Sequence, residues 1–234
     1  MSQTTNDGNE DQSGRRKFLG QLAGAATTAA LGIGGAGLAI PRALGAAPAD
    51  EAMTDVQVPN AEHWLDGLKG KHRQLVDGFA PNDGFPLAFA ATFLATQGPN
   101  PDAGAVVVLR HFAAPLGLTD AVWAKYKIGS TLNITDPATK AAAVRNPFLR
   151  PKPGVLLTDE MAVDRLLSHG VIIGVCNVAL NVMSGKFAAN GGVTPAVAYK
   201  EWVAGVIPGV HVLPSGVWGV NRAQEARCTY CSGG

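Results

Sequence analysis

Cys176 is the residue best placed for chemistry in this chain of 234 residues. It follows the apolar run Val171 to Val175 (VIIGV), which is typical of a buried parallel strand, and it opens a helical stretch through Phe187. A thiol at a helix N-terminus lies at the positive end of the helix dipole, which favours the thiolate, the reactive form of cysteine. The pattern therefore predicts a reactive thiol, with a small side chain packed under the helix as the alternative.

The other two cysteines, Cys228 and Cys231, form a C-x-x-C motif near the C-terminal end of the last predicted helix. The dipole at that end of a helix does not assist a thiolate, so the motif differs from thioredoxin-like sites. Metal binding would need further ligands, and the sequence has no second cysteine pair. We therefore expect a Cys228–Cys231 disulfide as the simplest state in an oxidising compartment, with a site that combines Cys176, this pair and a histidine as the alternative.

Among the five histidines, His111 has the most site-like position. It comes two residues after the β-branched run Ala105 to Leu109 (AVVVL), a second predicted parallel strand. The carboxyl ends of parallel strands meet at one edge of a sheet, so His111, Cys176 and the turn Pro214-Ser215-Gly216 are expected at the same edge. If the two strands are neighbours, His111 is the cation expected beside the sulfur. The alternative is a histidine that bonds to backbone at a strand end.

Motifs for a nucleotide cofactor or for common hydrolytic chemistry are absent from the sequence. It contains no Ser-His-Asp order, no H-E-x-x-H and no G-x-x-x-x-G-K, and Gly191-Gly192 does not form a dinucleotide fingerprint. Asp159-Glu160 is typical of the first turn of a helix and not of a carboxylate pair for acid–base catalysis. No nucleotide cofactor is expected, and the cofactor stays unassigned.

Apolar runs alternate with helical stretches after about residue 70. The predicted strands are His72–Phe79, Ala105–Leu109, Val171–Val175 and Val210–Leu213. The predicted helices are Pro86–Thr96, Thr119–Tyr126, Thr158–His169, the stretch from Cys176 through Phe187, Thr194–Ala204 and Ser215–Ala226. The proline-punctuated segment from Lys127 to Pro153 predicts a functional or mobile loop. Because the alternation implies parallel strands joined by right-handed crossovers, the sequence predicts a three-layer α/β domain.

The segment from His169 to Leu180 (HGVIIGVCNVAL) resembles the strand–cysteine–helix element of the DsrE/DsrF-like family. The stretch from Pro208 to Val217 (PGVHVLPSGV) is similar to that family's last strand and turn, and Ala223-Gln224 to its final helix. The resemblance runs from about His72 to the C-terminus. It implies a three-layer α/β/α fold with a mainly parallel sheet of about five strands, often assembled as a homo-oligomer. In members that act in sulfur metabolism, a cysteine in the position of Cys176 carries sulfane sulfur as a persulfide.

The first 49 residues resemble a bacterial twin-arginine export signal. Arg15 and Arg16 precede Phe18-Leu19 and an Ala/Gly-rich segment, and Ala47-Pro48-Ala49 is an A-x-A arrangement suited to signal peptidase. The alternative is a membrane anchor, but the composition of this segment makes its insertion energy marginal. We therefore expect a cleaved or loosely tethered leader, a domain spanning 50–234, and export in folded form by the twin-arginine translocase to the periplasm.

The net charge of the chain indicates which kinds of partner it can bind. The whole chain carries a formal net charge of +1, and the part after the leader is close to neutral with no basic stripe, which argues against nucleic acid or an anionic membrane surface. One hypothesis is a sulfur-handling or thiol-redox protein acting through Cys176, with a small sulfur-containing ligand. The other is a non-enzymatic periplasmic binding protein for a small ligand or metal at the strand edge, lined by Cys176 and His111. An oligomeric scaffold without chemistry is a third.

The paired arginines lead to a test of export. Replacing both, Arg15→Lys with Arg16→Lys, should keep the protein in the cytoplasm at its precursor mass, because the translocase recognises the pair. Fractionation and intact mass measurement check this, with Arg42→Lys as the control outside the motif. An unchanged periplasmic yield from the double variant would contradict the assignment.

Overall fold

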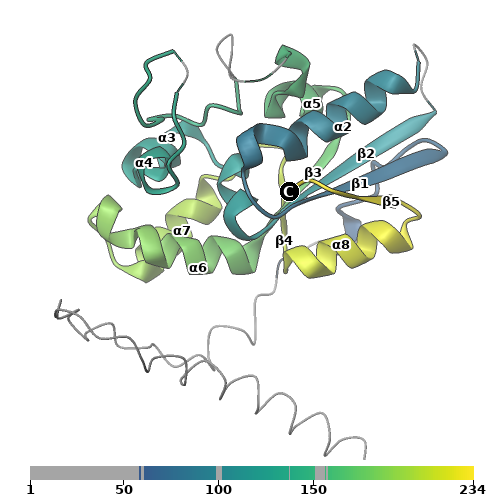
Figure 1. Ribbon diagram of the computed structural model, residues 1–234. Coiled ribbons are helices and arrows are strands. Elements are labelled where there is room, and N and C mark those ends of the chain that lie inside the picture. The colour runs from purple at the N-terminus through teal and green to yellow at the C-terminus, as the bar shows by residue number, and fades with distance from the viewer. Residues whose placement is uncertain (1–57, 59–60, 99–101, 137, 151–155, 157) are drawn as a thin grey trace, which may run out of the picture. The chain divides into compact units, whose positions relative to one another are not determined.

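The computed structural model describes residues 58, 61–98, 102–136, 138–150, 156 and 158–234 (Figure 1). All of them belong to one compact unit that spans Pro48–Gly234. The predicted export signal, including Arg15 and Arg16, lies outside the described residues, and so does its boundary with the following domain.

The described residues form one sheet of five parallel strands, in the order β4-β3-β2-β1-β5. The strands are β1 (His72–Gly78), β2 (Ala103–Leu109), β3 (Ile172–Cys176), β4 (His211–Leu213) and β5 (Thr229–Ser232). The first four correspond to the predicted strands within two residues at each end. Helices cover both faces, so the prediction of a three-layer α/β/α fold is confirmed.

Helices α2 (Phe85–Thr96) and α5 (Val163–Ser168) cover one face of the sheet, and α8 (Gly216–Glu225) covers the other (Figure 1). A further group of helices lies to the left of the strands in this view. It comprises α3 (Asp120–Lys125), α4 (Ile128–Thr131), α6 (Asn177–Phe187) and α7 (Pro195–Ala204). Short 3-10 segments complete the elements: η2 (Ala61–His63), η3 (Asn82–Gly84), η4 (His111–Gly117), η5 (Asp159–Met161) and η6 (Ala188–Gly191).

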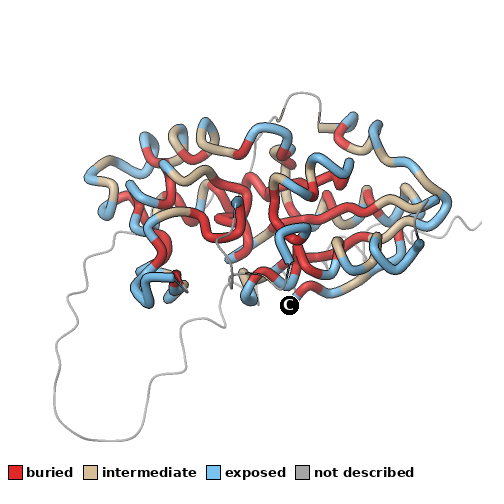
Figure 2. The backbone as a smooth tube through the Cα atoms, turned by 90° about the horizontal axis from the view of Figure 1, so that it is seen from above, coloured by how far each residue is buried: buried red, intermediate tan, exposed pale blue. Residues whose placement is uncertain are grey.

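The central strands β2 and β3 are largely buried, whereas the edge strands β4 and β5 carry exposed residues (Figure 2). Alternate residues of a strand point to opposite faces. Accordingly Val107 and Leu109 of β2 belong to the large core cluster under α2, whereas Val106 and Val108 belong to a smaller cluster with Trp64. This explains why β2 is a continuous apolar run without polar alternation.

The order of the strands sets where a ligand can bind. The chain adds β1 to β4 in one direction, and α8 then returns it along the other face to pair β5 with β1. Right-handed crossovers require this change of face when the direction reverses. At the carboxyl ends of β3 and β4 the chain therefore departs into α6 and α8, which pack in different core clusters. Such a point is where parallel α/β sheets bind ligands.

Two predicted segments differ from the structure. The helix expected over 158–169 is split into η5 and α5, because Ala162 between them has extended backbone (φ −72°, ψ 150°). The segment 127–153 is not an open loop: its described part contains α4 and buries Phe148 and Leu149 in the main core. Its apolar side chains anchor it, although its prolines predict irregular backbone.

Asn146 ties that segment to the carboxyl-edge segment η4. Its side chain is fully buried; Nδ2 donates to the carbonyls of Leu116 and Leu118 at 3.0 and 2.8 Å, and Oδ1 accepts from the N–H of Phe148 at 3.0 Å. One amide thus satisfies three buried backbone groups that secondary structure leaves unpaired.

Asn146→Ala should lower the free energy of unfolding by about 2–4 kcal/mol, because buried carbonyls and an N–H lose their partners. Urea denaturation followed by circular dichroism checks this. Asn221→Ala, at an exposed position of α8, is the matched control and should change stability by less than about 0.5 kcal/mol. Equal effects from the two variants would show that Asn146 does not anchor the segment.

Candidate functional site

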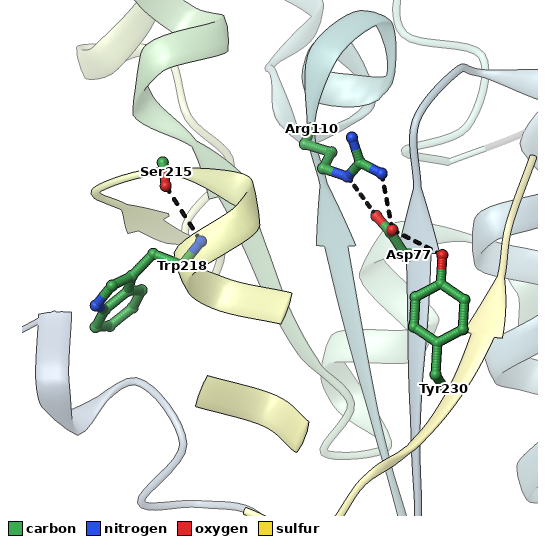
Figure 3. Close-up of polar contacts among 5 residues, drawn as sticks. All are labelled: Asp77, Arg110, Ser215, Trp218 and Tyr230. Carbon is green, nitrogen blue, oxygen red and sulfur yellow. Dashed lines mark hydrogen bonds and ion pairs between the residues drawn. The ribbon is translucent and has the colours of Figure 1, made fainter. Parts of the chain in front are cut away.

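Successive strands of the sheet each bring one polar side chain to the carboxyl edge. In the order of the sheet these are Ser215 after β4, Cys176 at the end of β3, Arg110 after β2, Asp77 in β1 and Tyr230 in β5. Each of the five comes from a different strand or strand end. Figure 3 shows that hydrogen bonds join Arg110, Asp77 and Tyr230 across three neighbouring strands.

Asp77 and Arg110 form a bidentate ion pair at the centre of this edge. Arg110 donates from Nε to Oδ1 at 2.7 Å and from Nη2 to Oδ2 at 2.9 Å, and the Asp77 carboxylate is only 4% exposed (Figure 3). The Tyr230 hydroxyl donates to Oδ2 at 3.0 Å. A buried carboxylate is tolerated only when such partners compensate its lost hydration. The hydrogen bond to Asp77 raises the pKa of both Arg110 and Tyr230.

Cys176 lies at the predicted junction and caps α6. Its Sγ accepts a hydrogen bond from the backbone N–H of Ala179 at 3.3 Å, and the residue is 6% exposed. The neighbouring Asn177 is buried and accepts from the Tyr199 hydroxyl at 2.8 Å, which ties the start of α6 to α7. The sulfur therefore occupies the position at which the helix dipole favours negative charge.

Arg110 and Cys176 follow paired residues of neighbouring strands, since Leu109 of β2 pairs with Val175 of β3. The pKa of Arg110 is raised mainly by its hydrogen bond to Asp77, and the charges of Tyr230 and, least, of Cys176 add to this. The Arg110 stem packs against Gly216, the first residue of α8; a Cβ at Gly216 would overlap the Arg110 side chain. The lack of a side chain at Gly216 thus lets the guanidinium stem lie between β2 and the start of α8.

His111 lies at the carboxyl edge of the sheet, as predicted, but its ring packs against phenylalanines and not against Cys176. Its backbone is in the left-handed region (φ 50°), and its ring stacks on Phe79 at 4.3 Å between centroids and meets the edge of Phe112 at 4.3 Å. Both phenylalanines and His111 are exposed. Arg110, one residue earlier, follows directly after β2 and pairs with Asp77.

Cys228 and Cys231 are not joined in the structure, where all three cysteines are free, and their disulfide in the exported protein stays a prediction. The last helix ends at Glu225, and the residues after Cys228 form β5, which the sequence analysis did not expect. Cys228 packs in the cluster on the α8 face, whereas Cys231 packs against the core on the opposite face. Thiols on opposite faces of a strand cannot meet the geometry of a disulfide.

Asp77, Arg110 and Tyr230 belong to the candidate site but were not predicted from the sequence. A signal existed for the first two, because each charged residue comes at the end of an apolar run that forms a parallel strand. Parallel strands deliver such residues to one edge. Tyr230 carried no such signal, since its own strand was not predicted.

Within the described part of the chain, no group of three or more His, Cys, Asp or Glu side chains is arranged to hold a metal ion. None of the helices described is both long and apolar enough to span a bilayer. No protein-family model matches the chain, and no curated protein is significantly similar to it.

Asp77→Asn should lower the free energy of unfolding by about 1–3 kcal/mol, because the partly buried Arg110 loses its charged partner. Urea denaturation checks the prediction. Asp66→Asn is the control, since the Asp66 side chain is 71% exposed and should contribute less than about 0.5 kcal/mol. A loss no larger than that of the control would mean that the ion pair does not hold this edge together.

Proposed function

We propose that this is an exported, DsrE-like protein that handles sulfane sulfur or thiol redox chemistry through Cys176. The observation that carries the proposal is the setting of the sulfur: Sγ accepts a hydrogen bond from the N–H of Ala179 at the start of α6. A helix N-terminus favours negative charge at such a position. The resemblance of the segment 169–180 to the family's strand–cysteine–helix element supports the same role.

The reaction is sulfur transfer. The Cys176 thiolate attacks the outer sulfur of thiosulfate or of a polysulfide, and a new sulfur–sulfur bond forms on Cys176 while the donor's sulfur–sulfur bond breaks. The electron pair of the broken bond leaves with sulfite or with a polysulfide one sulfur shorter. No external oxidant is consumed, and the product is a Cys176 persulfide anion.

Three features of the edge suit this step. The persulfide anion remains at the N-terminus of α6, where the helix dipole favours negative charge. Arg110 supplies a cation, and Asp77 holds its guanidinium in place through two hydrogen bonds. Because Cys176 is almost enclosed, small inorganic donors suit the site better than protein donors.

The remaining parts of the proposal are location and assembly. Arg15 and Arg16 support export through the twin-arginine translocase to the periplasm, and the family resemblance supports a homo-oligomer. A second candidate function is a non-enzymatic periplasmic binding protein that holds a small ligand at this edge. The burial of Cys176 favours it, because an enclosed thiol is less open to attack on a donor.

Incubation of the reduced protein with thiosulfate or polysulfide should add the mass of one sulfur atom per chain, and Cys176→Ser should abolish that gain, because the serine hydroxyl cannot form a persulfide. Intact mass spectrometry checks the prediction, and removal of the added mass by reductant shows that it is sulfane sulfur.

Cys231→Ser is the matched control, because it removes a thiol and leaves Cys176 intact; it should load like the unmodified protein. If Cys176→Ser loads equally, another thiol is responsible. If the unmodified protein neither loads sulfur nor reacts with a thiol probe at neutral pH, the binding-protein candidate replaces this one.

A further inference from the structure

We infer that Cys228 and Cys231 form a redox switch for β5, because joining them as a disulfide and keeping β5 in the sheet are mutually exclusive. The inference concerns a different pair of thiols from the proposed sulfur carrier and does not depend on Cys176. Its consequence reaches the candidate site, since Tyr230 lies between the two cysteines and bonds to Asp77.

The two thiols are held apart by the extended backbone between them. Cys228 is buried with Leu75 and Ala223 in the cluster on the α8 face, and Cys231 packs on the other face of the sheet. Three extended steps separate their Cα atoms by about 10 Å. A disulfide needs a Cα separation of at most about 7 Å with both Cβ atoms on the same side. Residues 228–231 must therefore leave the strand conformation to form one.

Leaving that conformation dismantles one side of the sheet edge. In the described sheet β5 lies at the edge beside β1, in the register Gln74↔Thr229 to Asp77↔Ser232. The Tyr230 hydroxyl then loses Asp77 Oδ2, and the adjoining bond from the N–H of Gly233 to the Asp77 carbonyl is strained or lost. Oxidation thus removes one of the partners of the carboxylate that holds Arg110.

The strand is suited to release. It has four residues and one neighbour, and the side chains of Thr229, Tyr230 and Ser232 are exposed. Little apolar surface is buried by β5 itself, so its opening costs less than that of β2 or β3. Cys231 is half-buried and Cys228 is buried, so an oxidant meets Cys231 first.

The chemistry is thiol–disulfide exchange with a low-molecular-weight disulfide such as glutathione disulfide. The Cys231 thiolate attacks one sulfur, forms a mixed disulfide and releases one thiol. Once the strand opens, Cys228 displaces the second thiol and closes the Cys228–Cys231 bond. Burial raises the pKa of the Cys228 thiol, so less of it is present as the attacking thiolate. Cys228 is therefore expected to react second and more slowly than Cys231. The two cysteines are oxidised, the added disulfide is reduced, and the protons of the two cysteines end on the released thiols.

The full chain carrying Cys176→Ser isolates the pair, because only Cys228 and Cys231 then remain. We would oxidise it with glutathione disulfide, confirm the loss of two hydrogens by intact mass, and compare hydrogen exchange of the oxidised and reduced forms. Amides of residues 229–232 should exchange at least tenfold faster after oxidation, while those of β3 (Ile172–Cys176) stay unchanged. Adding Cys231→Ala gives the control that cannot close the disulfide and should not respond.

A second measurement tests whether oxidation breaks the hydrogen bond between Tyr230 and Asp77. The hydrogen bond to Asp77 raises the pKa of Tyr230, so oxidation should shift its phenolate absorbance titration to lower pH, and Tyr230→Phe identifies its share of the signal. A disulfide that forms while residues 229–232 keep their protection would overturn the inference. So would a folded protein in which no disulfide forms under conditions that oxidise the urea-unfolded chain.

Discussion

The buried carboxylate of Asp77 is the constraint around which the carboxyl edge is organised. A charge this enclosed must be compensated, and the compensation comes from two other strands: Arg110 after β2 and Tyr230 in β5. Each partner is in turn fixed by its own surroundings. The Arg110 stem fits against Gly216, where no side chain intervenes, and its backbone N–H bonds to the carbonyl of Gly78 at 2.9 Å.

This ion pair joins two parts of the edge that have different chemistry. On one side Arg110 follows β2 next to the end of β3, where the sulfur of Cys176 caps an eleven-residue helix. On the other side Asp77 holds Tyr230, which lies within the C-x-x-C segment. A change in the redox state of Cys228 and Cys231 that displaces Tyr230 would therefore act on the Asp77–Arg110 ion pair through the Tyr230 hydrogen bond. The parallel sheet makes this path short, because neighbouring strands end at the same edge.

The proposed persulfide chemistry and the alternative of a binding protein both use this edge, and they differ only in whether the sulfur forms a bond. Helix-dipole assistance at the N-terminus of α6 is worth about 1 kcal/mol or less and favours negative charge there. At the same edge, Asp77 restrains Arg110 through two hydrogen bonds. Burial of the sulfur acts in the opposite sense, by limiting access.

The sequence by itself determined the first four strands, the helices that follow them and the place of Cys176, because apolar periodicity and the strand-to-helix junction are local signals. Only the tertiary structure decided what surrounds the sulfur. His111 and Arg110 are adjacent in sequence, but the left-handed backbone at His111 turns its ring onto Phe79, whereas Arg110 pairs with Asp77. Likewise, the sequence predicts a disulfide between Cys228 and Cys231 at the end of a helix. In the structure this segment is extended by its pairing with β1, which places the two thiols on opposite faces of the sheet. Pairing between residues 155 positions apart, as between Gln74 and Thr229, leaves no local pattern in the sequence.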